Sequence, residues 1–551
     1  MSTLYQQWQN IAYDETADRS QLEKFWGTYF QIEKEIYEKL LSNPDEVVKG
    51  TVKELAEKFG QEVLTMIGFL DGINESLLIE IDLDTVEEDT VVSLAFDKER
   101  LYKNMVAAKA DWLYELPQWK EIFSEEELKK CIQSAYDKKF DTDVIAPLVK
   151  ADGAYYLELF HGSTIAFKDM ALSILPYLLT TAAKKNGVTN DIVILTATSG
   201  DTGKAAMAGF ADVPGTKIIV FYPKDGVSPI QEKQMVTQKG DNTYVVAIRG
   251  NFDDAQTGVK KIFNDTEMKA ELEEAGYQFS SANSINIGRL VPQIVYYVYA
   301  YANLYKTGQI QQDEEINVVV PTGNFGNILA AYYAKNMGLP IKKLICASND
   351  NKVLFDFFTT GTYDRNREFI LTTSPSMDIL ISSNLERLLY RISGDDDQKT
   401  KDMMEALKST GKYTITEDMK ARLDDFAAGY ATEEECAQNI KKVYDKTGYV
   451  MDTHTSVASY VCECYQKNSG DNRKCVIAST ASPYKFVKSV MSAIDPKYAD
   501  QDEFSLLKVL EETSGREMPQ AIKDILNANI LHDLECDADK MKDTVKNILE
   551  V

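Results

Sequence analysis

The chain has 551 residues, of which 44% are hydrophobic and 26% charged, a composition typical of a globular protein with several domains. Its 86 acidic residues outnumber its 60 basic residues, so the formal net charge is −26. An acidic surface of this kind repels phosphate backbones and anionic lipids, so we expect neither a nucleic acid nor a membrane as a partner.

Cysteine and histidine usage excludes two further classes of protein. The seven cysteines are an odd number scattered over a long chain, which favours a reducing cytoplasm over a disulfide scaffold. Cys462 and Cys464 are the one close pair, and no further ligand follows them at zinc spacing, so we interpret them as structural. With only three histidines we expect no metal site. The N-terminus resembles no signal peptide, and no run approaches the ~20 apolar residues of a membrane span.

The first 115 residues differ from the rest of the chain in their pattern of apolar and charged residues. Apolar residues recur at helical spacing over 21–41 and 52–70, with charged residues between them. The region contains no His and no Gly-rich loop. We therefore predict a mainly α-helical accessory module over 1–115, a helical bundle without catalytic groups, with a hinge near Pro117.

From residue 191 onward, short β-branched runs alternate with helical stretches. This order predicts βαβ units and a parallel sheet, in which ligands bind beyond the carboxyl ends of the strands. A charged segment over 394–431 is predicted to be a peripheral helical insertion. The predicted strands are 191–196, 217–222, 244–248, 317–320, 343–347 and 475–478.

Two loops that follow these strands have the small residues typical of anion sites. The loop 197–204 (ATSGDTGK) precedes an Ala-rich helix, but Thr198 and Ala205 exclude a Walker A motif. The loop 321–327 (PTGNFGN) also precedes an Ala-rich helix and lacks the G-x-G-x-x-G spacing of a dinucleotide site. The first loop taken alone is equally explained by a tight turn with a helix cap. Together they favour one ligand with two anionic ends, or two ligands side by side.

Two other segments carry candidate groups. The segment 280–289 (SSANSINIGR) combines short polar donors with one arginine, which suits a dianion such as phosphate. Lys168 stands between an apolar stretch and an apolar helix, where desolvation lowers the pKa of a lysine and makes it nucleophilic. A capped helix start and a surface lysine are the commoner explanations for such patterns taken singly.

Five segments occur in a fixed order: HGSTIAFKD, TATSGDTGKAA, SSANSINIGRL, PTGNFGN and ASTASPYKF. Together they resemble the signature segments of threonine synthase, a pyridoxal-phosphate (PLP) lyase of fold type II, from about residue 123 to the C-terminus. The chain departs from that family at Ser163, Thr453 and Ser482, and its first ~115 residues replace the family's opening strand. The resemblance implies an α/β fold with parallel-rich sheets in two lobes. The implied lobes are a PLP-binding large lobe of 116–196 and 300–551, with a helical insertion near 394–450, and a smaller mobile lobe of 197–299.

The resemblance also implies a role for each candidate residue. Lys168 would be the Schiff-base lysine and the acid–base group, and Asp169 a structural helix cap. The PLP phosphate would be bound by Gly323, Asn324, Phe325, Gly326 and Asn327, and the pyridine nitrogen by Thr480. The substrate α-carboxylate would be bound by Thr198, Ser199, Gly200, Asp201 and Thr202, and the substrate phosphate by Ser281, Asn283, Ser284, Asn286 and Arg289.

The implied reaction is a step of threonine biosynthesis in the cytoplasm, catalysed by a monomer or homodimer. It converts O-phospho-L-homoserine and water into L-threonine and phosphate, with PLP as the electron sink. One alternative is another fold-type-II lyase, such as a dehydratase or a cysteine-synthase-like enzyme, which leaves the polar segment 280–289 unexplained. A second is a non-catalytic paralogue that binds PLP or a phospho-amino acid as a sensor, which the missing opening strand favours.

Overall fold

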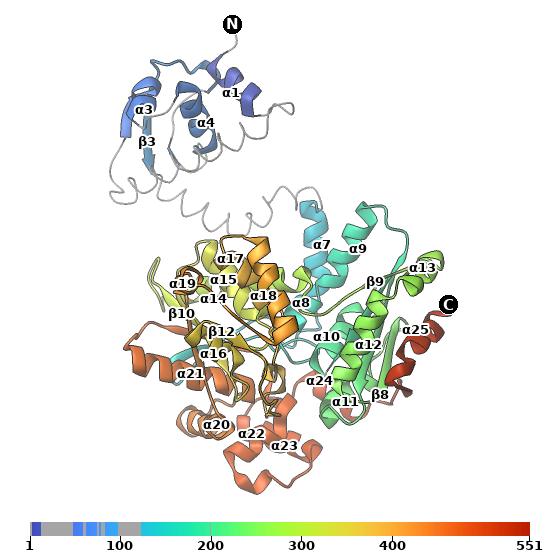
Figure 1. Ribbon diagram of the computed structural model, residues 1–551. Helices are drawn as coiled ribbons and strands as arrows, with labels where there is room; N and C mark the ends of the chain where they lie inside the picture. Colours follow the sequence, from blue (N-terminus) through green and yellow to red (C-terminus); the bar gives the residue numbers. More distant parts are fainter. Residues whose placement is uncertain are drawn as a thin grey trace. The chain divides into compact units, whose positions relative to one another are not determined.

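The computed structural model describes residues 3–12, 48–58, 62–73, 77–78, 83–96, 123–198 and 200–551. The chain divides into two compact units, Met1–Glu121 and Ile122–Val551, and each is described here by itself (Figure 1). None of the helices in these described ranges combines the length and the apolar character that crossing a membrane requires.

The first unit combines helices with a small antiparallel sheet. The sheet has the strand order β1-β3-β2, and the indole ring of Trp8 packs directly on the backbone of α4 at Gly68. Helices form most of the described elements, as predicted for a mainly α-helical module, and a small sheet accompanies them because the β-branched run that forms β3 pairs on both sides. The predicted helix 21–41 and the hinge near Pro117 lie outside the described residues. The elements are α1 (Leu4–Ala12), β1 (Val48–Thr51), α3 (Val52–Lys58), α4 (Val63–Ile73), β2 (Leu77–Leu78), η1 (Leu83–Thr85) and β3 (Val91–Phe96).

The second unit contains two larger sheets, and every predicted strand is confirmed. The six-stranded sheet has the order β14-β11-β10-β15-β5-β4 and is parallel except for the β4–β5 pair. The five-stranded sheet has the order β16-β8-β7-β6-β9 and is parallel throughout. The larger sheet consists of β4 (Leu148–Ala151), β5 (Ala154–Glu158), β10 (Ile316–Pro321), β11 (Ile341–Ser348), β14 (Phe426–Tyr430) and β15 (Cys475–Ser479). The smaller consists of β6 (Asp191–Ala197), β7 (Thr216–Pro223), β8 (Thr243–Arg249), β9 (Tyr277–Ser280) and β16 (Leu534–Asp537).

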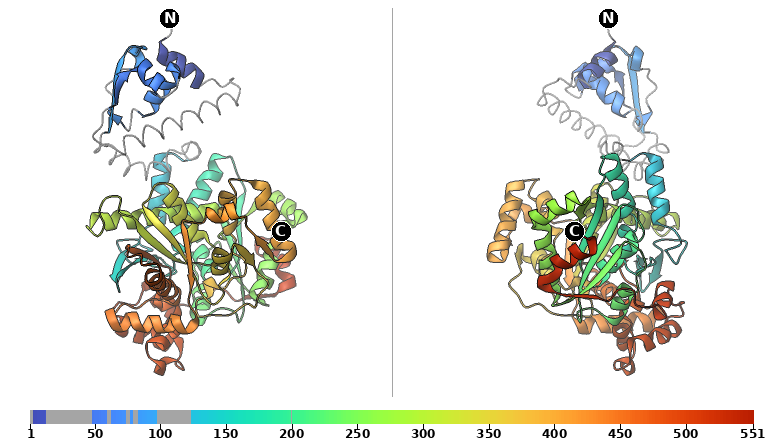
Figure 2. Two further views of the ribbon diagram at one scale, coloured as in Figure 1. Left: turned by 60° about the vertical axis from the view of Figure 1, so that its left-hand side comes forward. Right: turned by 90° about the vertical axis from the view of Figure 1, so that its right-hand side faces the viewer.

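Helices cover both faces of each sheet (Figure 2). Alternate strand residues enter different cores: Val193 and Leu195 face α12, α13 and α25, whereas Ile192 and Ile194 face α8 and α10. A strand buried on both faces is apolar throughout, which is why these runs were readable from the sequence. Around the smaller sheet lie α8 (Asp169–Leu172), α9 (Leu175–Lys185), α10 (Asp201–Phe210), α11 (Pro229–Val236), α12 (Phe252–Asn264), α13 (Thr266–Glu274) and α25 (Met541–Leu549).

The larger sheet is covered in the same way. One of its cores lies against α14–α18 and the other against α20–α24. The helices are α14 (Ile287–Lys306), α15 (Gly326–Asn336), α16 (Val353–Thr360), α17 (Leu385–Ile392), α18 (Asp397–Thr410), α20 (Glu433–Thr447), α21 (Thr453–Ser469), α22 (Val487–Ile494), α23 (Glu503–Ser514) and α24 (Gln520–Leu526). The remaining elements of this unit are α7 (Glu125–Ala135), β12 (Thr362–Asp364), η2 (Pro375–Met377), β13 (Lys412–Thr414), α19 (Glu417–Ala421), η3 (Pro483–Phe486), η4 (Pro496–Tyr498) and η5 (Ala538–Lys540).

The two sheets of the second unit do not follow the lobe boundaries that we expected. The expected large lobe 116–196 includes β6, yet β6 is an interior strand of the smaller sheet, and the C-terminal β16 returns to the edge of that same sheet. The predicted insertion 394–431 is not wholly peripheral either, because its strand β14 pairs with β11 and forms an edge of the larger sheet. In both cases the sheet to which a strand belongs is set by its pairing with a strand that is distant in the sequence.

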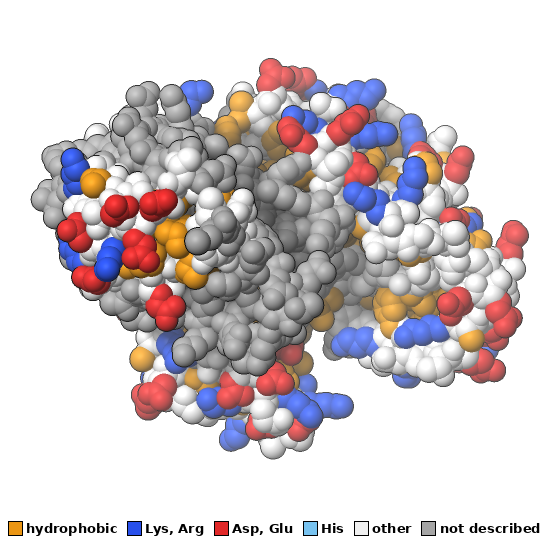
Figure 3. Space-filling view, turned by 90° about the horizontal axis from the view of Figure 1, so that it is seen from above, with side chains coloured by type: hydrophobic (Ala, Val, Ile, Leu, Met, Phe, Trp, Pro, Cys, Tyr) orange, Lys and Arg blue, Asp and Glu red, His pale blue; other side chains and the backbone are white. Residues whose placement is uncertain are grey.

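Positive and negative side chains are mixed over the described surface that Figure 3 shows. On the face drawn in Figure 3, acidic and basic side chains are interspersed over the described surface. The negative net charge of the chain is therefore not gathered into one patch on the described part of that face.

Gly209 on α10 provides a test of how the helices near the site are packed. A Cβ at this position would lie 2.1 Å from the carbonyl oxygen of Leu172 on α8. Gly→Ala in a helix interior normally stabilises by up to about 1 kcal/mol. Here we expect Gly209→Ala to lower the free energy of unfolding by about 1–3 kcal/mol, measured by urea denaturation, because backbone must move. Ala208→Ser on the same helix is the control. A Gly209→Ala protein as stable as the parent would contradict this packing.

Candidate active site

Lys168 is held in a turn that is tied to the segment after β15. The N–H of Phe167 donates to the carbonyl of Thr480 (2.8 Å), and the N–H of Ser482 donates to the carbonyl of Ile165 (3.0 Å). Ile165 has a φ of 53°, an unfavourable left-handed conformation for a β-branched residue. These two hydrogen bonds help to hold that turn, and they bring Lys168 and Thr480 to the same place.

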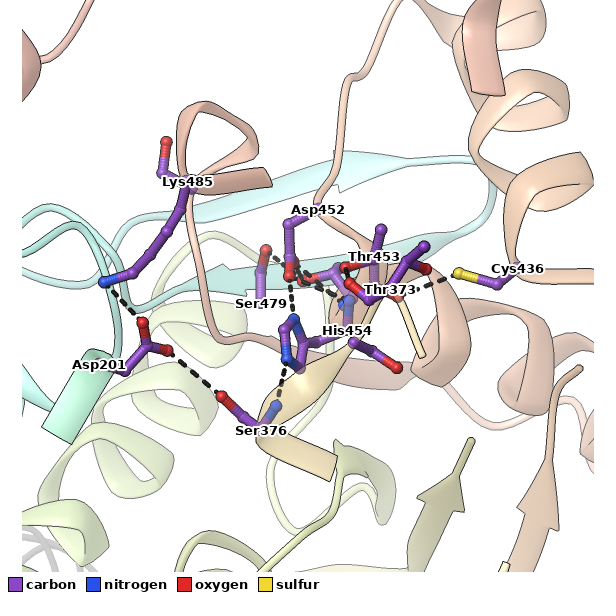
Figure 4. Close-up of polar contacts among 12 residues, drawn as sticks. Asp201, Thr373, Ser376, Cys436, Asp452, Thr453, His454, Ser479 and Lys485 are labelled. Atoms are coloured by element: carbon purple, nitrogen blue, oxygen red, sulfur yellow. Dashed lines mark hydrogen bonds and ion pairs between the residues drawn. The ribbon is translucent and has the colours of Figure 1, made fainter. Parts of the chain in front are cut away.

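A single carboxylate, that of Asp201, joins two buried lysines, Lys168 and Lys485, and Figure 4 shows its contact with Lys485. Lys168 Nζ lies 3.2 Å from Asp201 Oδ2, and Lys485 Nζ lies 2.9 Å from Asp201 Oδ1. Gln231 Nε2 also donates to Asp201 Oδ1 (2.7 Å), and Lys485 Nζ donates to the carbonyl of Thr164 (3.0 Å). Asp201 is the first residue of α10, so the loop after β6 places this carboxylate.

Burial and the two lysines set the protonation of this cluster. Burial raises the pKa of Asp201, but the charges of Lys168 and Lys485 outweigh it and hold that pKa well below its usual value. Burial lowers the pKa of Lys168; Asp201 opposes this shift, and repulsion from Lys485 and Arg289 adds to it. Lys168 therefore reaches its neutral, nucleophilic form more readily than a surface lysine does.

The loop after β10 has several features of an anion site. Phe325 has a φ of 66°, α15 begins immediately after it, and residues 323–327 line the cavity at this helix start, where backbone N–H groups have no partner within the helix. A Cβ at Gly323 would lie 2.3 Å from the carbonyl oxygen of Ser376, so no side chain fits there. Asn327 Nδ2 is buried without a hydrogen-bond partner among the described residues. These features fit an anion such as the PLP phosphate.

Arg289 on α14 is a buried cation without an anionic partner among the described residues. Only 4% of its surface is exposed, Nη1 donates to the carbonyl of Ala282 (3.0 Å), and Nε has no partner in the described part. Burial lowers the pKa of Arg289 to about 10, so the guanidinium is charged at neutral pH. Burying a charge without a counter-ion is costly, so this position is suited to a bound anion.

The cavity has a volume of about 1710 Å³ and brings together most of the residues that the sequence singled out. Ser199 lies outside the described residues. Gly200 and Asn286 do not line the cavity: the N–H of Gly200 donates to Thr198 Oγ1, and the Asn286 amide caps α14 and donates to Ser281. The predicted residues that line it are Lys168, Thr198, Asp201, Thr202, Ser281, Asn283, Ser284, Arg289, Gly323, Asn324, Phe325, Gly326, Asn327 and Thr480.

Two of the predicted residues make contacts within the chain. The carboxylate of Asp201 faces two lysines, so its side chain is suited to orienting those amines rather than to binding a substrate carboxylate. The Asn286 side chain donates to the carbonyl of Ser281 and accepts from the N–H of Gly288. The predicted ligand contacts of both residues stay predictions.

Sequence reasoning missed three polar residues of the site. Lys485 lies in the segment ASTASPYKF and His454 directly follows Thr453, but no pattern at either position marked these residues out. Ser376 lies in a segment without any motif, and only the tertiary structure places it against Lys168.

Comparisons with known proteins agree with this geometry. Residues 144–480 match the family described as pyridoxal-phosphate dependent enzymes, which is more than half of the chain. This chain belongs to that family. PLP is therefore its cofactor, and Lys168, the loop 323–327 and Thr480 lie where they could hold it.

Within the family, the chain is similar to threonine synthases. It is 41% identical over 394 residues to the human protein "Threonine synthase-like 1", covering 70% of this chain and 52% of that one. It is 37% identical over 396 residues to threonine synthase from Saccharomyces cerevisiae, covering 67% of this chain and 75% of that one. The crystal structure of PLP-bound threonine synthase from Brucella melitensis superposes with a TM-score of 0.70 at 33% identity, covering 81% of this chain and 90% of that one. The chain spans about half the length of the threonine synthase-like 1 proteins that it matches.

Lys168→Ala tests which lysine binds PLP. Lys485 is the competing candidate, because it contacts the same carboxylate. We expect borohydride reduction to attach PLP to a peptide containing Lys168 in the parent and in Lys485→Met. We expect no attachment in Lys168→Ala, as measured by mass spectrometry of the digested protein. A label on Lys485 in the parent would contradict the assignment.

His161, in the turn that precedes Lys168, gives a pH dependence of stability. Burial lowers the pKa of His161, but hydrogen bonds to Asp141 (2.8 Å) and Glu158 (3.0 Å) outweigh it and raise that pKa to about 9. Because the folded-state pKa is raised, this contribution to stability is complete below pH ~6.5 and is lost as the pH rises through about 9.

The difference in unfolding free energy between the parent and His161→Gln should therefore shrink as the pH rises from 6 to 9.5. Urea denaturation at several pH values measures it. A difference that is constant over this range would show that His161 is not charged in the folded protein.

Proposed function

We propose that this chain is a threonine synthase-like lyase that converts O-phospho-L-homoserine and water into L-threonine and phosphate. The observation that carries the proposal is the buried guanidinium of Arg289, which has no anionic partner in the described part of the chain and lies in the cavity that also contains Lys168. The loop 323–327 and Arg289 are two anion sites, which suit the phosphate of PLP and the phosphate of the substrate. The similarity to threonine synthases from yeast and bacteria supports this choice of substrate.

The residues would divide the work as follows. When bound, PLP supplies an electron sink for negative charge that develops at the substrate. Lys168, desolvated and beside Asp201, would move protons at Cα and Cβ. Arg289, with Ser281 and Ser284, would bind the substrate phosphate and stabilise its charge as it leaves Cγ. Water would then add at Cβ. The hydroxyl of Thr480 would face the pyridine nitrogen.

Two alternatives are weaker. Dehydratases and cysteine-synthase-like enzymes act on substrates without a phosphate at Cγ. In such an enzyme the buried guanidinium of Arg289 would have no substrate phosphate to bind. A non-catalytic sensor would need Lys168 to bind PLP but would not need it to transfer protons, so the buried carboxylate beside this lysine favours the enzyme. The free state of all seven cysteines is in keeping with the cytoplasmic location that we propose. A monomer or homodimer stays a prediction.

The direct test adds O-phospho-L-homoserine to the PLP-loaded protein and measures phosphate and L-threonine. Equal amounts of both products would support the proposal. Oxo acids formed from L-serine or L-threonine, without activity on phosphohomoserine, would favour a dehydratase. A change in the cofactor absorbance without any product would favour the sensor.

Arg289→Ala separates the two phosphate sites. Loss of a charge-assisted hydrogen bond should raise KM for phosphohomoserine about 10- to 100-fold, because the substrate phosphate loses its cation. The absorbance of bound PLP should stay unchanged. Arg365→Ala, which removes another arginine that lines the cavity, is the control and should change KM far less. Loss of PLP from Arg289→Ala would show that the two sites are exchanged.

A further inference from the structure

Ser376, in η2, touches the amine of Lys168 and lines the cavity. Lys168 Nζ lies 3.4 Å from Ser376 Oγ, and Ser376 Oγ lies 3.2 Å from Asp201 Oδ2. Since Lys168 Nζ also lies 3.2 Å from Asp201 Oδ2, the amine, the hydroxyl and the carboxylate form a closed triangle. A lysine side chain has many rotamers, and two acceptors restrict it to few of them.

The backbone of Ser376 is held by His454. The N–H of Ser376 donates to His454 Nε2 (3.2 Å), as Figure 4 shows. A backbone N–H can only donate, so Nε2 must be the unprotonated nitrogen of the ring. The ring proton is then on Nδ1, which donates to Asp452 Oδ2 (2.8 Å).

Asp452 is in turn fixed by the start of α21. Its carboxylate accepts from the N–H groups of His454 (3.0 Å) and Thr455 (3.1 Å), which caps the helix. Asp452 is fully buried, and His454 is 3% exposed. The tautomer of His454 is thus set by a helix cap, and the helix cap thereby determines which atom faces Ser376.

Further contacts hold the segment that contains Ser376. Thr453 Oγ1 donates to the carbonyl of Thr373 (2.7 Å). On the opposite side, the carbonyl of Ser376 approaches Gly323 so closely that a side chain there is excluded. The hydroxyl of Ser376 is therefore held between α21 and the loop 323–327, at a set distance from Lys168.

We propose that Ser376 is a further catalytic residue, whose hydroxyl, with Asp201, holds the Lys168 amine in position whenever that amine is not bonded to PLP. His454 and Asp452 are positioning residues, which act through the backbone of Ser376. This inference rests on the proposed function, because it concerns the proton transfers of Lys168. Asp201 already accepts from two lysines, Gln231 and Ser376, so it orients the amine and keeps its own charge.

Two pairs of variants of the PLP-loaded protein test the proposal. Ser376→Ala removes the hydroxyl, and Ser376→Thr retains it. His454→Asn keeps a donor for Asp452 but has no acceptor that reaches Ser376, whereas His454→Gln carries an acceptor near the position of Nε2. Ser459→Ala is the matched control, because it removes a buried hydroxyl from α21 whose partner is the hydroxyl of Tyr156 (2.9 Å).

Two rates are measured for each variant. One is kcat for phosphate release from phosphohomoserine. The other is the rate at which L-threonine displaces Lys168 from PLP, followed by stopped-flow absorbance, which needs no phosphate chemistry. We expect Ser376→Ala and His454→Asn to lower both rates about 10- to 100-fold with KM changed less than about twofold, since an oriented hydrogen bond to the amine is lost. Ser376→Thr and His454→Gln should recover most of the loss seen in Ser376→Ala and His454→Asn, and the control Ser459→Ala should stay near the parent.

The outcomes separate this inference from the proposed function. Parental displacement rates in Ser376→Ala would overturn the role of the hydroxyl. Equal losses in His454→Asn and His454→Gln would overturn the positioning role and indicate packing alone. If the parent releases no phosphate, the proposed function is wrong, yet the displacement rates still decide the role of Ser376.

Discussion

Two buried ammonium groups, those of Lys168 and Lys485, share the carboxylate of Asp201, and the rest of the site depends on this interaction. Neither lysine is stable in the interior without a counter-charge. The carboxylate joins the turn before α8, the start of α10 and η3, which are far apart in the sequence. It leaves one net positive charge in the cluster, so the site attracts anions although the chain as a whole is strongly acidic.

The two sheets explain why the anion sites lie in one cavity. In parallel sheets the carboxyl ends of the strands meet at one edge, and helices begin there with free N–H groups. β6 leads to α10 and Asp201, β9 leads to the segment of Arg289, and β10 leads to the loop 323–327. A substrate with a carboxylate at one end and a phosphate at the other, together with PLP, matches this arrangement of cations and N–H groups.

Buried hydrogen bonds at the start of α21 also hold the site in place. The helix cap at Asp452 fixes the tautomer of His454, and His454 holds the backbone of Ser376. A fully partnered polar network of this kind is rigid, because breaking any one bond leaves a buried group unpaired. This buried network thus determines where the amine of Lys168 can lie.

The sequence by itself determined the parallel strands, because residues buried on both faces form apolar runs that are read locally. It also marked the loops 197–204, 280–289 and 321–327 as candidate anion sites, because anion sites need small residues and short donors in consecutive positions. For Lys168 the local pattern alone favoured a surface lysine, and the resemblance to a known family singled it out. Contacts between distant segments were not readable: β14 joins the larger sheet from within a charged insertion, and Asp201, Ser376 and Lys485 meet across 284 positions of the chain. Single polar residues at ordinary positions carry no local pattern. Only the tertiary structure, which brings them together and buries them, decided their role.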